Sequence, residues 1–187
     1  MRRALFAFVL VVLGGCASTP PPSAPPPPDP ASVMPKLEER LAILIEEERG
    51  KIDPRARPLA IDPELSTIAR ARASDMAAKN YLAHASPTGD TAASLLMARD
   101  ATFQGLLGEN MSSVKFSRAY AIDVDAYARD LVDGWLKSPK HRENMSFADY
   151  HLAGIGAAVS QDTIYVTVLF ATDLGLPKAA SAEAGQP

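Results

Sequence analysis

A proline-rich stretch from Thr19 to Pro35 limits the part of this chain that can fold. It includes the run Pro25-Pro26-Pro27-Pro28, which favours the extended polyproline II conformation and lacks the N–H groups that helices and sheets need. We expect residues 16–35 to be a semi-rigid spacer, the alternative being a proline-motif ligand for a partner. The 187 residues then leave room for one domain, expected over residues 36–175 and followed by a disordered tail over residues 176–187.

The N-terminus has the features of an export signal. Arg2-Arg3 supplies positive charge, and Ala4 to Leu13 is an apolar run about half as long as a membrane-spanning helix. The next residues, Leu13-Gly14-Gly15-Cys16, resemble a lipobox. This pattern predicts a signal peptide over residues 1–15 and acylation of Cys16. The alternative is an ordinary secretory signal with an incidental cysteine.

The cysteine count and the net charge limit which kinds of partner this chain can have. Cys16 is the single cysteine, so no internal disulfide can staple the fold, and use as an acyl anchor explains why it is there. Ala17, in place of aspartate, predicts sorting to the outer membrane, facing the periplasm. Loss of residues 1–15 removes two arginines and no acidic residue, which changes the formal net charge from −3 to −5. We therefore expect membrane contact through lipid, no nucleic-acid partner, and a monomer.

Apolar residues recur at helical spacing over much of the chain. The pattern predicts a first helix closed by Gly50 and a second capped by Asp62, with Pro63 at its first position. A shorter helix is expected after Asp90-Thr91, and a longer one is expected to end before Pro139.

Strands are expected near the end of the chain. Apolar and polar residues alternate from Ile164 to Phe170, and Gly154 to Val159 can pair with them across the turn Ser160-Gln161-Asp162. Helices before and around a late antiparallel hairpin indicate a layered α+β fold.

Three segments carry uncommon polar residues at the ends of these elements. They are His84-Ala85-Ser86-Pro87, Gly108-Glu109-Asn110 and His141-Arg142-Glu143-Asn144. Taken singly, each has an ordinary interpretation, as a loop histidine, a cap, and a partner of a helix dipole. Their separations far exceed those of helix-borne zinc motifs, so only the tertiary fold could bring them together.

These segments occur in order with others over Leu37 to Thr172. The chain resembles the bacterial branch of the CAP superfamily of cysteine-rich secretory, antigen 5 and pathogenesis-related 1 proteins, also called SCP-like. The resemblance implies a three-layer α-β-α sandwich with a central antiparallel sheet and an open cleft that gathers the two histidines and the glutamate. The matching segments are Asp62–Leu65 through Ser74–Met76, Asn80–Pro87, Gly108–Asn110, Trp135–Asn144 and Gly154–Gly156.

The chemistry open to such a cleft follows from its residue types. His84, Glu109 and His141 could hold zinc or another divalent cation with water as the fourth ligand. Without metal, the same groups could form an acid–base pair, for which Ser86 or Ser138 would be the nearest nucleophile. Both serines have ordinary interpretations, Ser86 in a turn and Ser138 at a helix end.

The chain departs from the family pattern at several positions. Ser138 stands where many animal and plant members carry an acidic residue, and Asp133 or Glu143 could replace that residue only in part. Arg72 stands where bacterial relatives often have histidine, and Glu46 replaces a common asparagine. We expect neither of these two changes to contact His84, Glu109 or His141, which are called the trio below.

Three other residues are interpreted as structural. We expect His151 to be structural or exposed, and Trp135 and Phe147 to lie in the core rather than form a ligand platform.

Two functions follow from the resemblance, which implies sterol and lipid binding in several members and no single agreed reaction. The first is a non-enzymatic binding module anchored at the envelope, with a lipid, sterol-like or other envelope ligand. The alternative is a hydrolase that acts on peptide or cell-wall bonds through metal-activated water or the His–Glu pair. A buried polar network without any ligand is a third interpretation.

Overall fold

The computed structural model describes residues 27–173. The predicted signal peptide, the acylation site at Cys16, most of the proline-rich spacer and the C-terminal tail lie outside the described residues. None of the helices between residues 27 and 173 is long and apolar enough to cross a membrane.

A sheet forms the central layer, in the order β1-β3-β4-β2. Three of its strands are antiparallel, as predicted, and the two-residue β1 adds a short parallel edge that the sequence did not predict. This strand comes just before the second helix, and its two residues pair with Leu152 and Ala153 of β3. The strands are β1 (Ala60–Ile61), β2 (Leu107–Lys115), β3 (Leu152–Ser160) and β4 (Thr163–Ala171).

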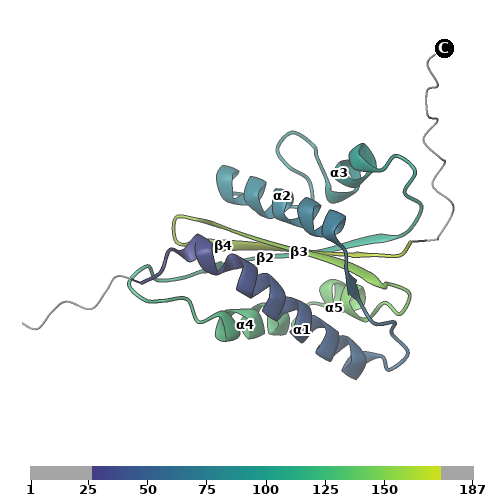
Figure 1. The fold of residues 1–187 in the computed structure, drawn as a ribbon, viewed down its shortest axis with the longest axis horizontal. Helices are drawn as coiled ribbons and strands as arrows, with labels where there is room; N and C mark the ends of the chain where they lie inside the picture. Colours follow the sequence, from purple (N-terminus) through teal and green to yellow (C-terminus); the bar gives the residue numbers. More distant parts are fainter. Residues whose placement is uncertain (1–26, 174–187) are drawn as a thin grey trace, which may run out of the picture.

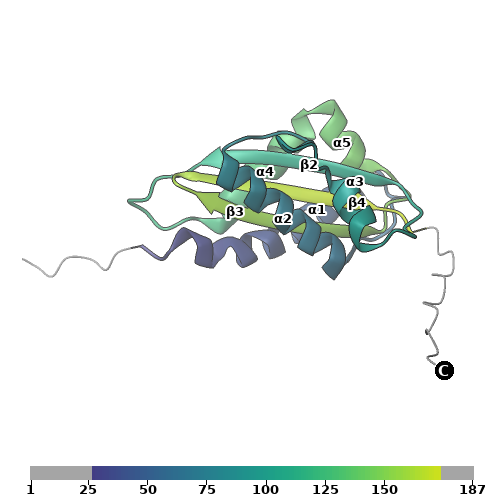
Figure 2. The same cartoon turned by 90° about the horizontal axis from the view of Figure 1, so that it is seen from above.

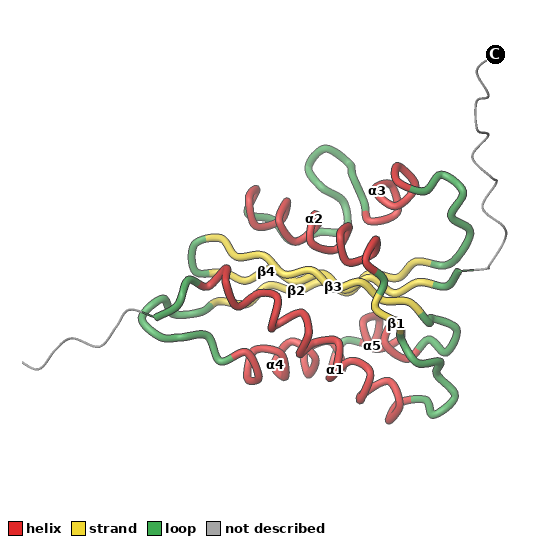
Figure 3. Tube along the Cα trace, viewed as in Figure 1, coloured by secondary structure: helices red, strands yellow, loops and turns green. Residues whose placement is uncertain are grey.

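Helices cover both faces of this sheet. The first, fourth and fifth helices lie on one face and the second and third on the other (Figures 1 and 3). The predicted three-layer α-β-α sandwich is therefore confirmed. The helices are η1 (Pro30–Val33, a 3-10 turn), α1 (Met34–Ile52), α2 (Pro63–Lys79), α3 (Ala92–Arg99), α4 (Val124–Lys137) and α5 (Pro139–Ser146).

The central strand β4 is buried on both faces, and it divides the hydrophobic core into two parts, one on each face of the sheet. Ile164, Val166, Val168 and Phe170 pack with apolar residues of α1 and α4. Leu169 faces the other way, toward α2 and α3. The predicted hairpin is confirmed, because Ser160 pairs with Thr163 across a two-residue turn.

Several helix ends agree with the sequence. The Asp62 side chain accepts a hydrogen bond from the backbone N–H of Leu65 (2.7 Å) and caps α2, as predicted. Thr91 caps α3, and α4 ends before Pro139.

Other helix ends differ. The first helix continues through Gly50 to Ile52, because glycine is tolerated inside a helix and this one has a helical backbone. Ordered structure also begins before residue 36, with η1 at Pro30 and a buried Met34. Proline suits the first positions of a helix, which explains how α5 can begin at the same Pro139 that ends α4.

Two glycines set the distance between α2 and the sheet. A Cβ on Gly154 would lie 2.1 Å from the carbonyl carbon of Leu65, and one on Gly156 would lie 2.1 Å from the backbone nitrogen of Arg70. The backbone of α2 therefore packs directly against β3. This close approach positions the residues of α2 that face the sheet.

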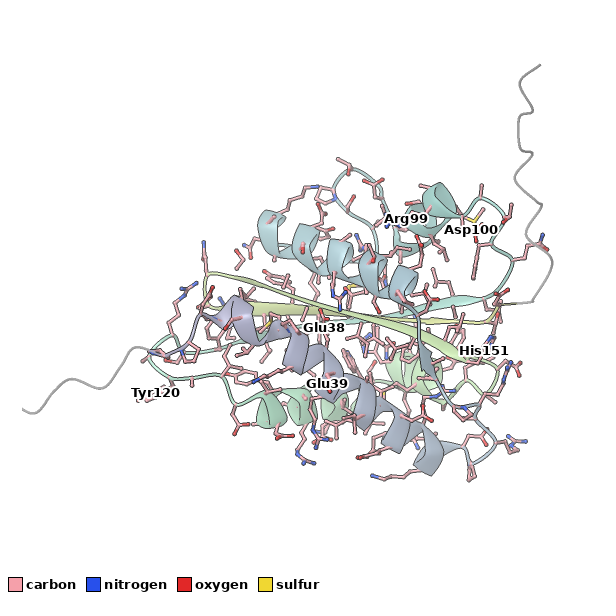
Figure 4. All side chains as sticks on the ribbon, viewed as in Figure 1. Glu38, Glu39, Arg99, Asp100, Tyr120 and His151 are labelled. Carbon is pink, nitrogen blue, oxygen red and sulfur yellow. The ribbon has the colours of Figure 1, made fainter. Side chains whose placement is uncertain are left out.

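An ion pair closes the exposed edge of β3. Glu38 of α1 accepts a hydrogen bond from the Ala157 N–H (2.9 Å) and pairs with Arg70 of α2 (2.6 Å). Glu38 can be located on α1 in Figure 4. The pair links the two helical layers across the sheet edge and uses a backbone donor that would otherwise be free to pair with another strand.

Candidate functional site

A cavity of about 550 Å³ opens at one end of the sheet. Figure 2 shows α3 and α5 at this end, with β2 between them. The structure brings all three predicted residues, His84, Glu109 and His141, to this cavity. Its other lining residues are Thr91, Ala92, Ala93, Leu107, Gly108, Ser138, Lys140, Glu143 and Asn144.

Glu109 is held from two sides. Its side chain is 9% exposed and projects from β2, where the residue pairs with Leu169 of β4. Oε2 lies 2.7 Å from Nδ1 of His84, whose side chain is 66% exposed. Oε1 lies 3.4 Å from Nε of Arg72, which is 1% exposed. Both carboxylate oxygens of Glu109 therefore have a nitrogen partner.

Arg72 connects the site to α2, and the expectation that it does not touch the trio was wrong. Its guanidinium donates to the Ala83 carbonyl (2.6 Å), next to His84, and to the Tyr81 hydroxyl (3.1 Å). Tyr81 in turn donates to Asp75 (2.6 Å). Arg72 thus holds both the carboxylate and the loop that carries the histidine.

The sequence contained a signal for this role. Arg72 lies on the same face of α2 as the buried Ile68, Ala69 and Met76. A charged residue on the core face of a helix is almost never fully buried without a partner. The glutamate that pairs with it lies 37 residues further along the chain.

His141 enters the cavity from α5. Burial lowers the pKa of its imidazole, and the nearby imidazole of His84 lowers this pKa further. His141 is therefore neutral at neutral pH and can accept as well as donate a hydrogen bond.

Asn110 and Asn144 attach α5 to β2, a role that the sequence did not predict. The side-chain amide of Asn110, which is fully buried, donates to the His141 carbonyl (3.0 Å). The Asn144 amide donates to the carbonyl of Glu109 (3.2 Å) and to the Asn110 side chain (2.9 Å). These bonds fix the two walls of the cavity relative to each other.

Gly108 is needed for the same close contact between α5 and β2. A Cβ at this position would lie 2.7 Å from the Tyr150 hydroxyl and 3.0 Å from Oδ1 of Asn144. The glycine therefore allows α5 and the following loop to approach β2.

The candidate nucleophiles differ in their surroundings. Ser86 is buried and does not line the cavity, and its hydroxyl accepts hydrogen bonds from the N–H groups of Asp90 (2.9 Å) and Thr88 (3.2 Å). This is the turn-forming role of its ordinary interpretation. Ser138 lines the cavity at the junction of α4 and α5. Of the two acidic residues that could replace the missing carboxylate, Glu143 lines the cavity and Asp133 does not.

The residues interpreted as structural do not line the cavity. His151 contacts Arg57 (3.1 Å) and is labelled in Figure 4. Trp135 is 1% exposed and donates to the Met111 carbonyl (3.3 Å). Phe147 packs on the core.

The trio does not have the arrangement of a three-ligand metal site. Among residues 27–173, no three His, Cys, Asp or Glu side chains are grouped so that they could hold a metal ion. Glu109 is instead hydrogen-bonded to His84, and its other oxygen faces the cationic Arg72. Binding of zinc or another divalent cation would require this arrangement to open, and it stays a prediction.

The comparisons with known proteins agree with this architecture. The family model described as CAP, cysteine-rich secretory protein family, matches residues 54–170. The chain belongs to this family. Its one cysteine lies outside the CAP domain, so this domain has the fold without the cysteines of the family name.

The relatives place the domain in the bacterial branch. The uncharacterized protein YkwD of Bacillus subtilis is 29% identical over 127 residues, which are 68% of this chain and 44% of that protein, so the match spans less than half of the relative. An outer surface protein of Borrelia burgdorferi superposes with a TM-score of 0.61 at 23% identity, over 74% of this chain and 93% of that one. An extracellular protein of Bacillus anthracis with an SCP domain gives 0.59 at 26% identity, over 81% and 45%.

Proposed function

We propose that this protein is an exported CAP-domain lipoprotein, anchored at the cell envelope through Cys16, whose cleft binds an envelope component without chemical turnover. The export signal and lipobox support the location. The structural relatives named as outer surface and extracellular proteins support export as well.

The two side-chain contacts of Glu109 are the observation on which the binding role rests. Arg72 and His84 engage the two carboxylate oxygens of Glu109, so this carboxylate already holds the histidine and the loop that carries it. The arginine partner carries a permanent positive charge. His84 and His141 line the same open cavity, where their ring nitrogens can form hydrogen bonds with a ligand.

The lining indicates the kind of ligand. Ala92, Ala93 and Leu107 provide apolar surface, and the histidines and Lys140 provide polar groups around it. This mixture suits an envelope component that has both polar and apolar parts, such as a lipid with its headgroup or a peptidoglycan fragment.

A pull-down with the purified protein tests the proposal. Lipid vesicles and insoluble peptidoglycan are each incubated with wild type, His84→Gln and His151→Gln, with and without a chelator. We expect one of the two materials to retain wild type and His151→Gln equally, and His84→Gln at least about tenfold less, since His84 lines the cavity and His151 does not. Equal retention of the two histidine variants would contradict binding in this cleft.

A second candidate function, hydrolysis, is favoured by the hydrogen bond between His84 and Glu109. With Nδ1 of His84 bonded to the carboxylate, Nε2 could take a proton from water or from Ser138. Turnover of peptide, ester or peptidoglycan substrates by wild type, lost in both His84→Gln and Glu109→Gln, would support this function instead of simple binding.

The anchor has a separate test. Cys16→Ser should move the protein from the membrane fraction to the soluble fraction, since acyl chains provide the proposed attachment. Persistence in the membrane would contradict acylation at this residue.

A further inference from the structure

The guanidinium of Arg72 has little freedom to move. It is 1% exposed, and three acceptors besides Glu109 hold it, namely the Ala83 carbonyl (2.6 Å), the Tyr81 hydroxyl (3.1 Å) and the Asp90 carbonyl (3.4 Å). Its position under the cavity therefore follows from the packing of α2 on the sheet and from the loop after α2.

A fixed positive charge at this place changes what Glu109 can bind. Arginine side chains are not deprotonated in proteins. The Nε of Arg72 lies 3.4 Å from Oε1 of Glu109. A cation bound to this carboxylate would lie about 2 Å from a carboxylate oxygen and hence close to the same guanidinium. The two positive charges would repel each other, more strongly than in bulk water because Arg72 is buried.

The acidic groups near the cavity do not complete a metal site among the described residues. Asp75 interacts electrostatically with Arg72 and is linked to it by hydrogen bonds through the Tyr81 hydroxyl, but it does not line the cavity. Glu143 lines the cavity, yet it forms no three-ligand group with the histidines among the described residues.

We propose that Arg72 is a specificity-determining residue of the cleft, which occupies the Glu109 carboxylate and so excludes divalent cations. The cleft then recognises its ligand through hydrogen bonds from the imidazoles and not through a metal ion. The proposal uses the same cleft as the proposed function but does not depend on which envelope component binds there.

The test is calorimetric titration of the purified protein with Zn²⁺ alone, for wild type, Arg72→Gln and Arg72→Lys. Glutamine removes the charge and keeps a polar side chain, while lysine keeps the charge and serves as the matched control. We expect Arg72→Gln to bind Zn²⁺ about 10- to 100-fold more tightly than wild type, and Arg72→Lys to resemble wild type. Adding Glu109→Gln to the Arg72→Gln variant should remove the gain.

The titration of wild type decides the question even if Arg72→Gln does not fold. Zn²⁺ binding by wild type that Glu109→Gln or His84→Gln abolishes would overturn the proposal, and so would equal affinity in Arg72→Gln and Arg72→Lys. A wild-type protein that binds its envelope component and also binds Zn²⁺ through Glu109 refutes this inference alone. One that binds neither refutes the proposed function and leaves this inference standing.

Discussion

Replacement of Arg49 by methionine should destabilise the domain strongly. Arg49 is 1% exposed in the last turns of α1 and donates to four backbone carbonyls. The acceptors belong to Met145 (2.6 Å), Tyr150 (2.9 Å), Arg57 (3.0 Å) and Phe147 (3.3 Å). One side chain thus ties α1 to the end of α5, to the loop before β1 and to the loop before β3.

The size of the effect follows from these acceptors. The bonds to Met145 and Tyr150 are buried, and a buried carbonyl left without a donor costs about 1–3 kcal/mol. The other two bonds are partly buried, so water can replace the donor there. Methionine preserves the apolar packing of the arginine stem and removes a charge whose burial is unfavourable, as the lowered pKa of Arg49 shows. Two buried carbonyls together cost about 2–6 kcal/mol, and loss of the buried charge offsets part of this, so the free energy of unfolding should fall by about 2–5 kcal/mol.

Urea unfolding followed by circular dichroism measures this loss. Arg55→Met is the matched control, because Arg55 is 87% exposed and its partner is the neighbouring surface residue Asp53. We expect the control to be indistinguishable from wild type. An unfolding midpoint for Arg49→Met equal to that of Arg55→Met would refute the view that the buried network stabilises the fold.

Three further predictions concern local features. Gly154→Ala should destabilise the domain by about 3 kcal/mol or more in the same assay, because the new Cβ meets the backbone of Leu65, whereas Gly134→Ala, with nothing within 4 Å, should stabilise α4 by about 0.5–1 kcal/mol. Asp62→Ala should cost about 1 kcal/mol through loss of the α2 cap, and an unchanged midpoint would contradict that role. The lowered pKa of His141 means that the unfolded chain binds more protons, so its contribution to stability is present above about pH 6.5 and decreases as the pH falls toward the folded pKa; His141→Gln should flatten the pH dependence of the unfolding midpoint over this range.

Local patterns in the sequence were sufficient for most of the elements. The cap at Asp62, the stop at Pro139 and the β3–β4 hairpin depend on residues within a few positions of each other, so each can be identified without the rest of the chain. The strand β2 could not be identified in this way. It carries polar residues such as Glu109 and Asn110, and it is held in the sheet by pairing with β4, about 60 positions away in the sequence.

The candidate site divides in the same way. The residue types and the family resemblance pointed to His84, Glu109 and His141, and the fold brings them to one cavity. The sequence alone did not show that Arg72 occupies the carboxylate of Glu109, a contact between residues 37 positions apart. Gly154 and Gly156 let α2 pack directly on the sheet, and the arginine on the buried face of this helix then lies beneath the cavity. Charge and residue type are encoded locally, whereas the partner of a buried charge is decided by how two layers meet.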